Sequence, residues 1–214
     1  NEYASEIGIQ ILKNGGNAID AAVAVGFALA VVHPGAGNIG GGGFMVIRLA
    51  DGTVETIDFR EVAPSSAYRD MFLDDSLNVI PNKSWSTSWA SGVPGSVAGL
   101  GVAHEKFGSL PWWQLINPAI KLAQHGYHLD IINYLYLNSP YYNDYLSRDI
   151  ETKKIFTKNN GFFELDELFI QKDLAKTLKR ISRLGYKELY NGKTDEMIVQ
   201  CMNRTSGLIT MEDL

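Results

Sequence analysis

Apolar residues recur at helical spacing at the start of the chain. The segment 2–13 is expected to form an amphipathic helix, because three or four residues separate most of its apolar positions. The pair Gly15-Gly16 follows as a stop signal. The expected buried face consists of Ala4, Ile7, Ile11 and Leu12.

A second helix is expected over residues 18–32, where the pattern differs. This segment is apolar on every side, so we expect it to lie between two layers rather than on a surface. Asn17 and Asp20 favour its start, since their side chains accept hydrogen bonds from free N–H groups. Pro34 favours its end. The apolar run 21–32 covers about a dozen residues and is too short to cross a bilayer.

The spacing of apolar residues changes from helical to alternating after residue 43. Two runs rich in β-branched and aromatic residues, 44–49 and 53–60, flank Asp51-Gly52 and predict a β-hairpin. The segment 131–163 is rich in Tyr and Asn and is expected to mix short helices with loops. Other helices are expected over 97–107, 174–184 and 194–202. Two more are expected to begin at Pro111 and at Pro118, each an N-terminal proline of its helix.

The order of these segments favours an α+β fold, with helices packed against a mainly antiparallel sheet. No internal repeat, low-complexity linker or domain boundary is visible, so residues 1–214 are expected to form one partial domain. The net charge of −5 argues against nucleic acid as a partner. The single cysteine, Cys201, excludes an internal disulfide.

The most conspicuous local feature is a glycine-rich run, with six glycines in residues 35–43. Residues 35–40 spell G-x-G-x-x-G, but a helix is expected before the run and a strand after it. A dinucleotide site needs the reverse order, because the helix N-terminus holds the pyrophosphate. We therefore expect no nucleotide. The glycines indicate either a close crossing of main chains or the close approach of a ligand, and the sequence leaves both open.

No metal or cofactor is expected. His125 and His128 are three residues apart, but Gly126 lies between them and no third ligand follows at a useful spacing. No serine-histidine-aspartate arrangement is recognisable either.

Arg60 is the sharpest single candidate for binding. It ends an expected strand, so its side chain should lie at the mouth between strand and loop. A planar guanidinium suits bidentate capture of a carboxylate. The alternative is a surface arginine paired with Asp58 or Glu61, and composition alone favours that alternative.

Ordered motifs along nearly the whole chain resemble those of the γ-glutamyltranspeptidase family. The early motifs are GGNAIDAAVA at 15–24, HP at 33–34, GNIGGGGF at 37–44 and IDFRE at 57–61. The later ones are GVPG at 92–95, KFG at 106–108, PAI at 118–120, QKDLA at 171–175, YNG at 190–192 and GLIT at 207–210.

The resemblance implies the large-subunit part of an N-terminal nucleophile hydrolase, an αββα four-layer sandwich. Such a precursor cuts itself, and the new N-terminal Thr of the small subunit is both nucleophile and, through its α-amino group, base. The family's Thr-Thr-His stretch is missing here, and Thr210 belongs to the large-subunit pattern. No catalytic residue is therefore expected in this chain, and the chain alone should be inactive.

By the same resemblance, Arg60 matches the arginine that binds the α-carboxylate of the γ-glutamyl group. The implied activity is γ-glutamyl transfer and hydrolysis on glutathione and similar compounds. The implied partners are the small subunit, the γ-glutamyl substrate, and an acceptor amino acid, peptide or water. The implied location is periplasmic or secreted. Alternatives are an acylase or poly-γ-glutamate depolymerase of the same fold, or a non-catalytic scaffold.

Overall fold

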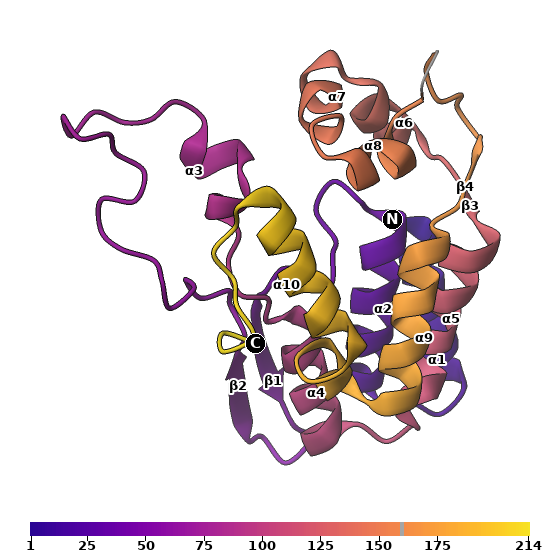
Figure 1. Ribbon diagram of the computed structural model, residues 1–214. Helices are drawn as coiled ribbons and strands as arrows, with labels where there is room; N and C mark the ends of the chain where they lie inside the picture. The colour runs from indigo at the N-terminus through magenta and orange to yellow at the C-terminus, as the bar shows by residue number, and fades with distance from the viewer. Residues whose placement is uncertain (159–160) are drawn as a thin grey trace. The chain divides into compact units, whose positions relative to one another are not determined.

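The computed structural model describes residues 1–158 and 161–214 (Figure 1). The chain divides into two compact units, each built from two separate stretches of sequence. The first unit comprises Asn1–Asn38 and Gly108–Ser182, and the second comprises Ile39–Phe107 and Arg183–Leu214. Because the units interleave along the sequence, they do not by themselves test the expectation of one partial domain.

The first unit is built around α2 (Ala18–Val32). Helices α1 (Glu2–Lys13) and α5 (Trp112–His125) both pack on α2, which confirms that this all-apolar helix is covered on more than one side. Ring packing extends the core, since Phe27 of α2 meets Trp112 edge-on at 5.5 Å between ring centroids. Helix α9 (Lys172–Leu184) joins this core, and the Trp112 indole N–H donates to the carbonyl of Ile181 at 3.0 Å.

Polar side chains satisfy main-chain groups at both ends of α2. At its start, the Asn17 side chain accepts the N–H groups of Ile19 and Asp20, as the sequence predicts. At its end, the carbonyls of Val31 and Val32 accept hydrogen bonds from the amides of Gln171 and Asn133, at 2.7 and 2.9 Å. These amides satisfy carbonyls that have no partner within the helix.

Asp20 does more than begin the helix. Its carboxylate is fully buried and accepts hydrogen bonds from the N–H of Asn17, the N–H and hydroxyl of Ser109, and the N–H of Leu110. Burial works to raise the pKa of Asp20, but the hydrogen bonds from Ser109, Asn17 and Leu110 outweigh it and lower the pKa. One carboxylate therefore ties α2 to the segment that leads into α5.

Helix α5 corrects one prediction. Pro118 does not begin a second helix but lies inside a single helix that starts after Pro111. A proline in a helix interior removes one hydrogen bond. The loss is offset here because Leu115, Ile116 and Ala119 on the same helix are fully buried.

The segment between α5 and α9 holds short elements, as expected. They are β3 (Tyr127–His128), α6 (Ile131–Asn138), α7 (Pro140–Leu146), α8 (Ile150–Phe156) and β4 (Leu168–Phe169), with β3 and β4 paired antiparallel. Residues 159–160, which fall within the expected mixture of helices and loops, lie outside the described residues.

The second unit holds the predicted hairpin. Strands β1 (Phe44–Arg48) and β2 (Val54–Asp58) pair antiparallel, with Phe44 opposite Asp58 and Arg48 opposite Val54. The pairing continues past the strands, because Phe59 and Gly43 exchange main-chain hydrogen bonds at 3.0 and 3.3 Å. The other elements are α3 (Lys83–Ser86), η1 (Ser88–Ala90), α4 (Ser96–Phe107), η2 (Tyr186–Leu189) and α10 (Lys193–Thr205). In the described residues, no helix is long and apolar enough to cross a membrane.

Candidate functional site

Arg60 lies two residues beyond the end of β2 and is exposed. Its main-chain N–H donates to the Asp58 carboxylate at 3.0 Å. Within the described residues, its guanidinium has no hydrogen bond or ion pair, either with Asp58 or with Glu61. The alternative that composition favoured, in which Arg60 forms a surface ion pair with Asp58 or Glu61, is therefore wrong. The guanidinium is available to a ligand.

Glycines allow the main chain around Arg60 to be approached closely. A methyl group added at Gly42 would come within 2.5 Å of the Phe59 carbonyl oxygen, and one added at Gly95 would overlap the same atom. The N–H groups of Gly95 and Ser96 both donate to the carbonyl of Gly41 at 2.8 Å. For Gly42, the open question about the glycine run is answered by a close crossing of main chains.

One face of the hairpin beside Arg60 is exposed and carries three apolar side chains. Phe44, Val46 and Val54 are exposed by 64%, 74% and 59%, whereas Ile47 and Ile57 on the other face are buried. Successive strand residues point to opposite faces, so Arg48, Thr56 and Asp58 share the exposed face with the three apolar side chains. Apolar side chains exposed on a sheet normally pack against another layer.

The structure shows where the histidine and glycine motifs lie. His125 ends α5, while His128 lies in β3 with its Nδ1 atom 2.7 Å from the carbonyl oxygen of Asp166. Among the described residues, no group of three or more His, Cys, Asp or Glu side chains is arranged to hold a metal ion. The G-x-G-x-x-G run follows α2 and precedes β1, so it has the order that disfavours a dinucleotide site.

Thr210 is engaged in a local structural contact. Its N–H and hydroxyl donate to the Asp213 carboxylate at 2.8 and 2.9 Å, and the N–H of Ser65 donates to the same carboxylate at 2.7 Å. The main-chain donors of Ser65 and Thr210 lower the pKa of Asp213 to about 2. In this structure the Thr210 hydroxyl therefore helps to hold the Asp213 carboxylate.

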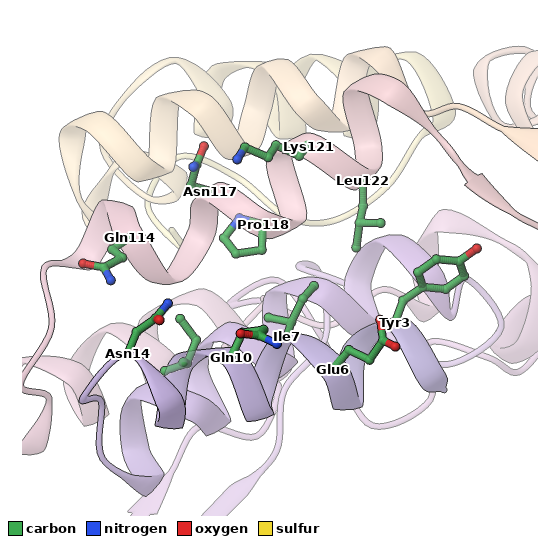
Figure 2. Close-up of a pocket in the computed structure, with 11 residues that line it drawn as sticks. Tyr3, Glu6, Ile7, Gln10, Asn14, Gln114, Asn117, Pro118, Lys121 and Leu122 are labelled. Carbon is green, nitrogen blue, oxygen red and sulfur yellow. The ribbon is translucent and has the colours of Figure 1, made fainter.

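A groove of about 450 Å³ lies within the first unit, between α1 and α5 (Figure 2). Its floor is apolar, and side-chain amides of both helices stand along its rim. Arg60 does not line it, and its lining includes no His, Cys, Ser or Thr that could serve as a nucleophile or imidazole base. The labelled lining residues are Tyr3, Glu6, Ile7, Gln10, Asn14, Gln114, Asn117, Pro118, Lys121 and Leu122.

Comparison with known proteins places these features in a family context. The family model described as Gamma-glutamyltranspeptidase matches residues 4–214. The glutathione hydrolase proenzyme of Escherichia coli strain K12 is 46% identical over 213 residues, which cover 99% of this chain and 36% of that protein. The chain thus spans about a third of the length of the curated relatives it matches.

Solved structures of γ-glutamyltranspeptidases are similar to this chain over its whole length. The crystal structure of Helicobacter pylori γ-glutamyltranspeptidase has a TM-score of 0.96 at 48% identity, covering 100% of this chain and 61% of that one. A γ-glutamyltranspeptidase from Pseudomonas nitroreducens, complexed with L-DON, has a TM-score of 0.91 at 41% identity, covering 100% of this chain and 62% of that one.

Proposed function

The chain belongs to the γ-glutamyltranspeptidase family, and we propose that the whole protein transfers and hydrolyses γ-glutamyl groups of glutathione and related compounds. Family membership confirms the fold class, α+β and of the N-terminal nucleophile hydrolase type, of which this chain is a part. The described residues hold two two-stranded antiparallel sheets, fewer strands than the two sheet layers of the αββα sandwich need. In the proposal, this chain contributes the part of the large subunit that binds the substrate carboxylate.

The observation that carries the proposal is the exposed guanidinium of Arg60, which has no hydrogen bond or ion pair among the described residues and lies on a closely packed main chain. A γ-glutamyl group presents a free α-carboxylate, which a guanidinium can bind through two parallel hydrogen bonds. Once water is excluded, removing one partner of such a pair costs about 2–5 kcal/mol of binding. The α-carboxylate lies away from the scissile γ-amide, so Arg60 anchors the substrate and takes no part in the reaction itself.

The reacting group is proposed to come from another part of the same precursor. An N-terminal Thr released by self-cleavage attacks the γ-amide carbonyl, while its own α-amino group takes the hydroxyl proton. The C–N bond of the γ-amide then breaks, and the amine leaves with that proton. The acyl-enzyme that remains passes the γ-glutamyl group to water, or to an amino acid or peptide acceptor. The present chain alone is expected to be inactive, since it supplies no such Thr.

The small subunit of that precursor is also the proposed partner of the hairpin. Phe44, Val46 and Val54 are the apolar side chains of the exposed hairpin face beside the Arg60 segment. Covering this face would remove apolar area from water at about 25 cal/mol per Å². It would also bring the small subunit, and so the nucleophile, to the side of the chain that carries Arg60.

Two alternatives have less support. An acylase of the same fold has no need for a free α-carboxylate, so it leaves the unpaired Arg60 unexplained. A non-catalytic scaffold would not need an unpaired guanidinium either. A periplasmic or secreted location is proposed from the family alone.

The test is the mature full-length protein. N-terminal sequencing and intact mass should show two fragments, the smaller beginning with Thr, and the preparation should release glutamate from glutathione. The 214-residue chain, assayed beside it, should release none. An uncut, fully active protein, or activity of this chain by itself, would contradict the proposal.

A further inference from the structure

Phe59, the residue before Arg60, is fixed by main-chain hydrogen bonds and by close contacts of its ring. Phe59 exchanges main-chain hydrogen bonds with Gly43, at 3.0 and 3.3 Å. Its ring lies against two glycines, because a methyl group at Gly43 would come within 3.0 Å of the ring and one at Gly99 of α4 would overlap it. A close fit of this kind leaves Phe59 little freedom to move.

The residues after Arg60 are also held. A methyl group at Gly92 would lie 2.9 Å from the Glu61 Cβ atom, and the N–H of Val93 donates to the carbonyl of Val62 at 2.8 Å. Arg60 itself has no side-chain hydrogen bond or ion pair among the described residues. The point and direction at which its side chain leaves the main chain are therefore set by its neighbours along the chain.

We propose that Phe59 is a positioning residue for Arg60, and that its packing against Gly43 and Gly99 sets the enzyme's preference for substrates with a free α-carboxylate. This inference rests on the proposed function, in which Arg60 binds that carboxylate. Bidentate binding needs the guanidinium plane and the carboxylate to be aligned. A side chain with no fixed partner of its own follows any shift of its main chain, and a shift that breaks one of the two parallel hydrogen bonds weakens the binding of the carboxylate.

The experiment compares two substrates in the mature full-length protein. One is a γ-glutamyl anilide, and the other is the 4-aminobutanoyl anilide, which keeps the amine and lacks the α-carboxylate. The selectivity is the ratio of kcat/KM for the first to kcat/KM for the second. Gly99→Ala should lower this ratio by about tenfold or more, through a higher KM for the γ-glutamyl anilide and with little change in kcat. The second substrate should be turned over as by wild type.

Two further variants separate positioning from stability. Phe59→Leu loosens the same contact without adding atoms, and it should lower the ratio even if Gly99→Ala does not fold. Gly101→Ala is the matched control, because Gly101 lies in the same helix and an added methyl group would overlap the ring of Tyr186 instead. It should lower the melting temperature and leave the ratio unchanged.

The outcomes distinguish this inference from the proposed function. If wild type does not prefer the γ-glutamyl anilide, or if Arg60→Ala retains the preference, the role of Arg60 itself is wrong. If Arg60→Ala removes the preference while Phe59→Leu and a folded Gly99→Ala retain it, only the positioning role is wrong. The positioning role of Phe59 is also wrong if Gly101→Ala lowers the selectivity ratio as much as Gly99→Ala does.

Discussion

Replacing Asp20 by Asn tests whether one buried carboxylate holds the first unit together. Its Oδ1 atom accepts the N–H groups of Ser109 and Leu110, and its Oδ2 atom accepts the N–H of Asn17 and the hydroxyl of Ser109. An Asn side chain keeps one acceptor and places an NH₂ group against donors. The Ser109 hydroxyl can turn to accept, but a main-chain N–H cannot.

The loss of stability in Asp20→Asn follows from the number of hydrogen bonds that the carboxylate accepts. At least one main-chain N–H is left facing a donor, and a buried unsatisfied group costs about 1–3 kcal/mol. The remaining hydrogen bonds lose their charge, and each weakens by about 1 kcal/mol. We expect Asp20→Asn to lower the free energy of unfolding of this unit by about 3 kcal/mol, and Asp20→Ala by more.

The assay is urea unfolding of the mature protein, followed by amide hydrogen exchange in peptides that contain Ser109 and Leu110. Asp20→Asn should expose these amides earlier than wild type. Asp173→Asn is the control, because Asp173 pairs with Lys176 on the surface and its loss should cost less than about 1 kcal/mol. Equal exchange at Ser109 and Leu110 in wild type and Asp20→Asn would refute the reasoning.

Acid should act in the same direction as the substitution. The pKa of Asp20 is lowered in the folded chain, so its contribution to stability is complete above about pH 4, the ordinary range of an Asp side chain. The contribution falls as the pH drops through the lowered value. Wild type should lose more stability than Asp20→Asn below about pH 4.

Three further predictions concern the second unit. Gly95→Ala should lower the unfolding free energy by about 1–3 kcal/mol, because its methyl group overlaps the Phe59 carbonyl oxygen. Its control is Gly161→Ala in the first unit, which should be neutral in the same thermal melt because no atom of the described residues lies within 4 Å of the added methyl group. Asp213→Asn should speed amide hydrogen exchange at Ser65 at neutral pH, because it removes the carboxylate that accepts the Ser65 N–H. In wild type this hydrogen bond should weaken only as the pH falls from about 4 toward the Asp213 pKa of about 2. Unchanged exchange at Ser65 in Asp213→Asn would contradict the prediction. Val46→Lys on the exposed hairpin face should reduce assembly with the small subunit, seen as loss of the smaller fragment on co-purification, and normal co-purification would place that partner elsewhere.

Local structure was the part of the fold most readable from the sequence. The all-apolar segment 18–32 and the Asp51-Gly52 turn each carry a strong local signal, and α2 and the hairpin lie where that signal places them. Pro118 was misread because the burial of its neighbours, which offsets a missing hydrogen bond, is not a local property. Asp20 was recognised only as a helix start, because its partner Ser109 lies 89 residues further along the chain.

The candidate site was predictable only in part. Arg60 was placed at the strand end, and its motif supplied the role that composition alone did not favour. The sequence could not show that its guanidinium is unpaired, since Asp58 lies two residues away and could equally have paired with it. Nor could it show that Gly42 and Gly95 converge on the Phe59 carbonyl, because that contact depends on the folded chain.

The central claim is that Arg60 anchors the α-carboxylate of a γ-glutamyl substrate. The most direct test is the KM of the mature Arg60→Ala enzyme for a γ-glutamyl anilide, measured beside Arg60→Lys. We predict that Arg60→Ala raises KM by about 30-fold or more, equivalent to about 2 kcal/mol, and that Arg60→Lys falls between it and wild type because it keeps charge without the planar fork. A KM for Arg60→Ala within a few-fold of wild type would contradict the claim.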